Sequence, residues 1–150
     1  MLEGKVILLL GATGGIGSKV AEEASKLGAK LILVARTKKK LDELNAKIKN
    51  SIAFEADATN FNDLKSMVEK VEDRFGKIDV LIHAVGSILL KPIHILKQEE
   101  FEETLQINLV SAFLAIKAVI RGMMRRKNGA IIIISSVAGV VLIGLVGMYL

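Results

Sequence analysis

The chain has 150 residues, enough for one domain with a hydrophobic core and too few for two. Apolar residues make up 51% of it, which excludes global disorder, and the lack of cysteine excludes disulfides and thiolate metal sites. The net charge is +5, but aromatic residues are few (4%) and no nucleic-acid-binding module is recognisable. We therefore expect a single domain over residues 1–150, with no metal and no nucleic acid partner. Because the N-terminus does not have the pattern of a signal peptide, we also expect a cytoplasmic location.

Apolar strand patterns and amphipathic helix patterns alternate from the N-terminus. Residues 5–10 (KVILLL) form a continuous apolar run, which is typical of a strand buried on both faces. Apolar residues then recur at helical spacing over 15–27, and Gly28 follows as a stop signal. Residues 30–35 (KLILVA) predict a second buried strand, and the apolar spacing over 41–48 predicts a second helix.

The same alternation continues to the C-terminal region. Strands are predicted at 51–54, 78–83 and 130–135, with helices at 61–75 and 98–127 between them. Five strands separated by helices imply parallel pairing through right-handed crossovers. The predicted fold is therefore α/β, a doubly wound parallel sheet, for which we expect the Rossmann-like strand order 3-2-1-4-5.

A glycine-rich segment, residues 11–17 (GATGGIG), joins the first strand to the first helix. Glycines permit a tight turn and let the backbone approach a pyrophosphate, while the helix N-terminus supplies free N–H groups. In this context the segment predicts a dinucleotide-binding loop; the alternative is a glycine-rich turn without a ligand. The predicted cofactor-binding residues of the loop are Gly11, Thr13, Gly14, Gly15, Ile16 and Gly17.

The end of the second strand indicates which dinucleotide is bound. An acidic residue at this place would hold the ribose hydroxyls of NAD. Here the strand ends at Ala35, followed by Arg36 and Thr37, and Arg36 could bind a 2′-phosphate in bidentate fashion. We expect NADP(H) rather than NAD, with a solvated loop arginine as the alternative interpretation of Arg36.

The spacing of Gly11, Gly15 and Gly17 resembles that of the short-chain dehydrogenase/reductase family, and the resemblance covers nearly all 150 residues. Residues 54–59 (FEADAT) look like the family's segment after the third strand, which implies that Asp57 contacts the adenine amino group and that Ala58 also binds the cofactor; the alternative for Asp57 is a carboxylate near a helix N-cap.

The family's Asn-Asn-Ala-Gly turn after the fourth strand reads His83-Ala84-Val85-Gly86 in this chain. The resemblance implies cofactor contacts from Ala84 and Gly86. The asparagines are lost, so the turn must be stabilised differently. We interpret His83 as a buried histidine at the strand end rather than as a catalyst.

Three further residues match the family's catalytic positions, namely Asn108, Ser136 and Tyr149. The resemblance implies hydride transfer between a nicotinamide and a small carbonyl or alcohol substrate. Tyr149 would exchange the proton, Ser136 would orient the substrate oxygen, and Asn108 would support a proton relay. Tyrosine has an ordinary pKa of about 10, so it needs a neighbouring ammonium. In the family a lysine four residues after the tyrosine supplies it, and that position lies beyond Leu150, so the family's fold is expected to be incomplete on its C-terminal side.

Three interpretations therefore remain open. The first is an NADP-dependent oxidoreductase represented by a truncated chain, and the second is a non-catalytic nucleotide-binding remnant. The third is a tail-anchored membrane protein, because residues 130–150 carry no charge and follow a basic cluster. We disfavour membrane insertion, since 130–135 complete the sheet as its fifth strand. The helix predicted over 98–127 has apolar residues on more than one face, and the family commonly packs it against its copy, so a homo-oligomer is possible.

Overall fold

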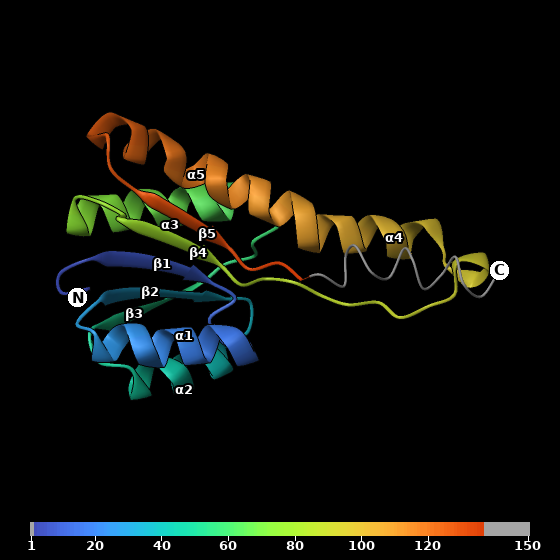
Figure 1. The fold of residues 1–150 in the computed structure, drawn as a ribbon, viewed down its shortest axis with the longest axis horizontal. Helices are drawn as coiled ribbons and strands as arrows, with labels where there is room; N and C mark the ends of the chain where they lie inside the picture. The colour runs from blue at the N-terminus through green and yellow to red at the C-terminus, as the bar shows by residue number, and fades with distance from the viewer. Residues whose placement is uncertain (1, 137–150) are drawn as a thin grey trace.

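The computed structural model describes residues 2–136, so the predicted catalytic Tyr149 lies outside the described residues. The strands of the described region are β1 (Val6–Leu10), β2 (Lys30–Ala35), β3 (Ser51–Glu55), β4 (Val80–His83) and β5 (Ala130–Ile133). They form one parallel sheet in the order β3-β2-β1-β4-β5 (Figure 1). This order confirms the predicted doubly wound α/β fold.

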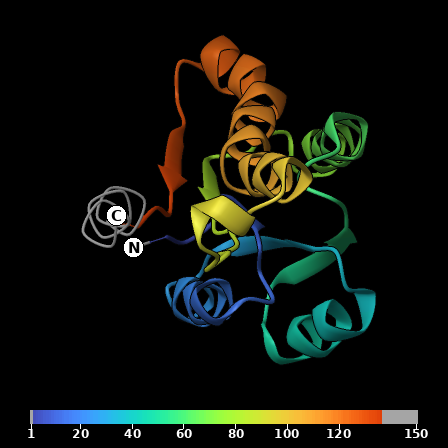
Figure 2. The same cartoon turned by 90° about the vertical axis from the view of Figure 1, so that its right-hand side faces the viewer.

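Helices cover both faces of the sheet. Their bounds are α1 (Gly15–Lys26), α2 (Lys38–Lys47), α3 (Phe61–Phe75), α4 (Gln98–Leu105) and α5 (Ser111–Arg126). The pair α1 and α2 lies on one face, and α3 and α5 lie side by side on the other (Figures 1 and 2). This layering follows from the sequence, because parallel strands need crossovers and each crossover helix has one apolar face to bury.

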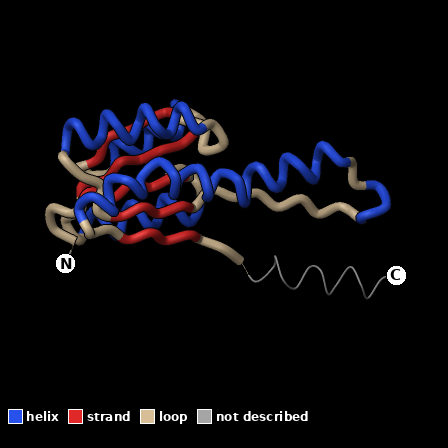
Figure 3. The backbone as a smooth tube through the Cα atoms, turned by 90° about the horizontal axis from the view of Figure 1, so that it is seen from above, coloured by secondary structure: helices blue, strands red, loops and turns tan. Residues whose placement is uncertain are grey.

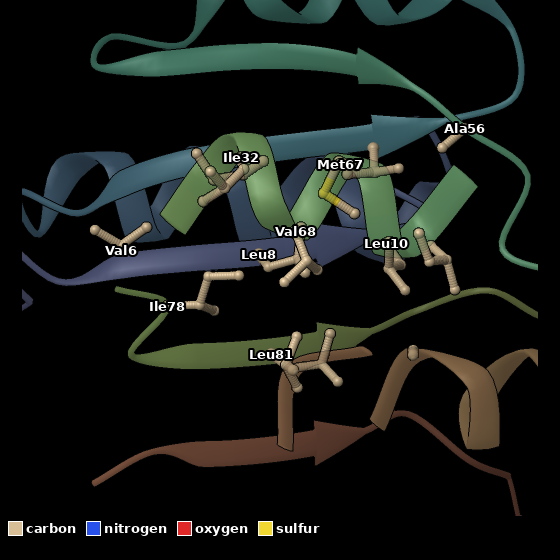
Figure 4. Close-up of a cluster of buried hydrophobic side chains, with 14 of the residues drawn as sticks. Val6, Leu8, Leu10, Ile32, Ala56, Met67, Val68, Ile78 and Leu81 are labelled. Atoms are coloured by element: carbon tan, nitrogen blue, oxygen red, sulfur yellow. The ribbon is translucent and has the colours of Figure 1, made fainter. Parts of the chain in front are cut away.

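The hydrophobic core has two halves, one on each side of the sheet. Alternate residues of β1 serve the two halves: Leu8 and Leu10 face α3 and α5, whereas Ile7 and Leu9 face α1 and α2. Figure 4 shows Leu8 and Leu10 beside Met67, a residue of α3, in the first of these clusters. Every residue of β1 is almost fully buried, which explains its continuous apolar run. The sheet thus holds the ends of its central strands in a fixed arrangement.

The long helix predicted over 98–127 is present but not uniform. A π-helical segment, Gln106–Val110, separates α4 from α5, and α5 ends at Arg126 before Lys127, which has a left-handed backbone (φ 51°). The helix α5 packs on α3 and β4, whereas α4 and the loop before it project beyond the sheet as an arm (Figures 1 and 3). The sequence did not predict this interruption.

One helical stretch in the described region, Gln98–Arg126, is long and apolar enough to cross a membrane by length and composition alone. Its α5 part includes Val119 and Met123, which are buried in the core of the sheet. Such burial is what a core helix requires, so the length of this helix is weak support for a membrane span. The uncharged segment 130–150 begins as strand β5, paired in register with β4.

Candidate functional site

A cavity of about 200 Å³ opens at the carboxyl ends of the parallel strands. Such an edge, where the crossovers on either side of β1 diverge, is where open α/β sheets bind their ligands. Most of the predicted cofactor-binding residues line it: Gly11, Thr13, Gly14, Arg36, Thr37, Asp57, Ala58, Ala84 and Gly86. Gly15, Ile16 and Gly17 do not line it; they form the first turn of α1, and the Ile16 side chain is exposed.

The glycine loop has a shape that only glycine permits at two of its positions. Gly11 has a positive φ of 77°, and a Cβ there would lie 2.5 Å from the carbonyl oxygen of Ala84. A Cβ on Gly17 would collide with the carbonyl oxygen of Gly11. The spacing of these glycines therefore reflects close packing of the loop against the end of β4 and against its own helix.

The loop also leaves the start of α1 open to an anion. Gly14 is the N-cap and has no side chain with which to satisfy the first N–H groups of the helix. These groups and the helix dipole together favour a negatively charged ligand, such as a pyrophosphate. The cradle thus fits a dinucleotide both sterically and electrostatically.

Residues after β2 and β3 form the other end of the cavity. The N–H of Gly11 donates a hydrogen bond to the carbonyl oxygen of Val34 (3.0 Å), which holds the loop against the end of β2. Beyond it Arg36 is exposed and lines the cavity together with Asp57. Asp57 Oδ1 accepts hydrogen bonds from the N–H and the hydroxyl of Thr59 (both 2.8 Å).

The carboxylate of Asp57 is held in its ionised form. The Thr59 N–H is the largest cause of its lowered pKa, and the positive charge of Arg36 contributes. The N-cap of α3 is Asn60, whose side chain accepts from two N–H groups of the helix (3.0 and 3.4 Å). Asp57 is therefore available to the cavity instead of capping the helix.

His83 is a buried strand-end residue, as interpreted from the sequence, with 1% of its surface exposed. Its Nε2 lies 2.9 Å from the hydroxyl oxygen of Ser111, the first residue of α5. Among the described residues its Nδ1 has no hydrogen-bond partner. Burial lowers the pKa of His83, so the ring is neutral at physiological pH.

Asn108 lies in the π-helical segment and ties it to the loop after β4. Its Oδ1 accepts from the N–H of Ser87 (3.0 Å), and its Nδ2 donates to the carbonyl oxygen of Thr104 (2.9 Å). Residues on either side of this contact, Gly86 and Ile107, line the cavity. Asn108 therefore sits at the rim, and its tertiary hydrogen bond explains a residue that is otherwise unfavourable in mid-helix.

The remaining predicted catalytic residues are only partly covered by the structure. Ser136 is exposed and follows β5, at the same edge of the sheet as the cavity. Tyr149 is outside the described region, so its position relative to Ser136 and Asn108 is not described.

Some residues that line the cavity were not predicted from the sequence. Thr59 could have been found as the hydrogen-bond partner of Asp57 two residues earlier, whereas Ile107 carries no sequence signal.

Comparison with known proteins finds one matching family profile and several similar proteins. The sequence profile described as short chain dehydrogenase matches residues 5–150. An uncharacterized oxidoreductase of Listeria innocua is 37% identical over 142 residues, covering 92% of this chain and 57% of that protein. A 3-oxoacyl-[acyl-carrier-protein] reductase of Vibrio cholerae is 34% identical, with 92% and 57% covered, and a fatty acyl-CoA reductase of Acinetobacter baylyi is 32% identical, with 91% and 48% covered. The chain thus spans about half the length of these relatives.

Proposed function

The chain belongs to the short chain dehydrogenase family, and from this premise we propose that it binds NADP(H) and serves hydride transfer between the nicotinamide and a carbonyl or alcohol substrate. The observation that carries the proposal is the cavity formed by the glycine loop, the end of β2 and the end of β4. When bound, the cofactor would supply the hydride to a carbonyl or accept it from an alcohol; the protein's residues would bind and orient the cofactor.

Each end of the cavity has a role in this proposal. The loop Gly11–Gly17 and the N-terminus of α1 would hold the pyrophosphate, since N–H groups and the helix dipole converge there. Asp57 would accept a hydrogen bond from the adenine amino group, as an ionised carboxylate. Ala84 and Gly86 leave room along the end of β4 because neither has a long side chain.

The preference for NADP(H) is supported by charge at the start of α2. Arg36 is followed by lysines at positions 38–40, in the first turn of α2, and that turn contains no acidic residue. No carboxylate follows β2 directly to repel a 2′-phosphate, because the strand ends at the buried Ala35. The guanidinium of Arg36 is suited to a bidentate bond with phosphate.

The test compares the affinities for NADPH and NADH by titration of cofactor fluorescence. The chain should bind NADPH more tightly, and Arg36→Ala should reduce that preference by about tenfold or more, since a hydrogen bond to a charged group is worth about 1.5–3 kcal/mol. Lys47→Ala removes a positive charge in the last turn of the same helix and should leave the preference unchanged. Equal affinities for the two cofactors in the unmodified chain would refute the role of Arg36.

For catalysis we propose Tyr149 as the proton-exchanging residue, with Ser136 orienting the substrate oxygen and Asn108 supporting the relay. We expect negligible turnover from these 150 residues alone, because the ammonium that lowers the tyrosine pKa in the family falls beyond Leu150. Oxidation of NADPH by a small carbonyl compound measures this. Reduction that survives Tyr149→Phe would contradict the assignment.

We also propose a cytoplasmic homo-oligomer formed through the long helix, without nucleic acid or membrane partners. Four large apolar side chains follow one another at every fourth position and are exposed: Phe101, Leu105, Leu109 and Phe113. This spacing puts them on one side of the arm formed by α4 and the start of α5. An exposed apolar stripe of this length is typical of an interface.

A further inference from the structure

His83 stands where three parts of the candidate site meet. It is the last residue of β4 and lies in register opposite Leu10, the residue before the glycine loop. Its carbonyl oxygen accepts a hydrogen bond from the N–H of Ile134 (2.9 Å), on the segment that leads to Ser136. Its side chain faces α5 and ends at Ser111. A single residue therefore contacts the strand before the loop, the segment before Ser136 and the start of α5.

The protons of this contact can be assigned from the donor count. The Ser111 hydroxyl donates to the carbonyl oxygen of Ile107 at 2.5 Å. A hydroxyl has one proton, so the oxygen of Ser111 must accept the bond from His83, whose Nε2 therefore carries the proton. The Nδ1 of the neutral ring is then bare, and among residues 2–136 it has no hydrogen-bond partner, neither donor nor acceptor. Ser111 thus selects one neutral tautomer.

The accepting carbonyl, that of Ile107, belongs to the π-helical segment. This segment is held at two points: Asn108 binds the N–H of Ser87, and Ser111 links Ile107 to His83. We propose that His83 is a positioning residue for the candidate site: as the neutral Nε2–H tautomer it fixes Ser111, and through Ser111 the π-helical segment that presents Ile107 and Asn108 to the cavity.

The length of the side chain at position 83 is what makes this link possible. The Nε2 of histidine is one bond farther from Cβ than the amide nitrogen of asparagine, whereas the amide nitrogen of glutamine is at the same bond separation as Nε2. His83→Gln should therefore preserve a donor to Ser111, and His83→Asn should leave the hydroxyl without one. Both variants place a polar amide at position 83, but only glutamine can reach Ser111. The pair therefore tests whether the hydrogen bond matters or whether any polar residue suffices.

The tautomer is tested by ¹⁵N NMR of the imidazole nitrogens. The chain has only two histidines, and His94 is exposed, so its signals serve as an internal reference. The expected result for His83 is a protonated Nε2 and a bare Nδ1. In Ser111→Ala the ring should no longer hold this single tautomer. A protonated Nδ1, or a tautomer mixture like that of His94, would overturn the proposal.

The positioning role is tested by amide hydrogen exchange over residues 106–112, with the amides of β2 as a reference. Ser111→Ala and His83→Asn should each speed exchange there by about tenfold, and the double variant should add little, since both remove one link. His83→Gln should stay within about twofold of the unmodified chain. Thr104→Val removes a hydroxyl that donates to its own i−4 carbonyl oxygen (2.8 Å) and should not speed exchange at 106–112.

The effect on ligand binding rests on the proposed function. NADPH affinity should fall about threefold to tenfold in Ser111→Ala and His83→Asn and recover in His83→Gln. If amide exchange over 106–112 rises in Ser111→Ala and His83→Asn while NADPH affinity stays unchanged, the positioning role is overturned. If the unmodified chain does not bind NADPH, the proposed function fails, while the tautomer and the exchange pattern still decide whether His83 fixes the segment. Equal behaviour of His83→Asn and His83→Gln would refute the link itself.

Discussion

Gly11 carries two separate constraints, and substitution can distinguish them. Its φ of 77° disfavours any side chain, and a Cβ would also lie 2.5 Å from the carbonyl oxygen of Ala84. Gly4 has a similar φ of 71°, but a Cβ there would have no heavy atom within 4 Å beyond its chain neighbours. Gly4→Ala should therefore cost only the backbone term, about 1 kcal/mol of unfolding free energy, whereas Gly11→Ala should cost clearly more.

Urea unfolding of the two variants measures this difference, and NADPH titration measures its consequence. Gly11→Ala should also weaken cofactor binding, because the loop must move away from β4 to relieve the contact. Gly4→Ala, remote from the cavity, should bind as the unmodified chain does. Equal destabilisation by the two changes would mean that the loop moves at no cost.

His83 makes the fold sensitive to mild acid. Burial lowers its pKa below the ordinary value of 6.5, so the unfolded chain takes up a proton that the folded chain refuses. Stability is therefore unaffected by His83 above about pH 7 and falls as the pH drops below about 6.5, by at most about 1.4 kcal/mol per pH unit. Asp57, with a pKa lowered by the Thr59 N–H, acts in a more acid range, below about pH 5.

Urea unfolding between pH 7 and pH 5 tests this assignment. His83→Gln keeps the donor but cannot titrate, so its stability should change less over this interval than that of the unmodified chain. A pH dependence that persists in His83→Gln would assign the effect to another group.

Helices α3 and α5 are joined by an ion pair that is partly shielded from water. Arg126 donates to Glu72 (2.9 Å) and to the carbonyl oxygen of Ile78 (2.8 Å), and its side chain is 23% exposed. Gly122 makes room for Glu72, since a Cβ there would collide with its carboxylate. Arg125 reaches the same Glu72 only at 3.6 Å and is 74% exposed.

These geometries predict unequal effects of two neighbouring arginines. Arg126→Ala should lower the free energy of unfolding by about 1–3 kcal/mol, because it leaves Glu72 and the Ile78 carbonyl oxygen without their donor. Arg125→Ala should change it by less than about 0.5 kcal/mol, as is usual for exposed pairs. Thermal unfolding of both variants at one pH and one salt concentration measures this difference. Similar losses of unfolding free energy in the two variants would show that burial does not distinguish the two arginines.

The elements also show how far the sequence could predict this protein. The parallel pairing of the sheet follows from buried runs alternating with amphipathic helices, and the glycine loop follows from its place between β1 and α1. The π-helical segment could not be predicted, because it depends on Asn108 meeting Ser87 in space, and the apolar pattern of 98–127 is that of an ordinary helix. The partner of His83 was equally hidden, since Ser111 approaches it only once α5 is packed on β4.

Among residues 2–136, the projecting arm exposes a row of large apolar side chains. Burying one of its exposed side chains, such as Leu109 (63% exposed) or Phe113 (60%), against a second copy would remove apolar area from water at about 25 cal/mol per Å². In a dimer with a two-fold axis, each residue of the stripe contributes to the interface once from each copy. A charge placed within the stripe is therefore doubly unfavourable in the assembly.

Leu109→Glu and Phe113→Glu should each shift the chain toward the monomer, by about tenfold or more in the dissociation constant, as measured by sedimentation equilibrium. Leu27→Glu is the matched control, because Leu27 is also exposed (51%) but lies at the end of α1, on the opposite face of the sheet. It should leave the association unchanged. A chain that is monomeric without substitution, or that loses association equally in Leu27→Glu, would contradict an interface on the arm and leave its apolar stripe to another partner.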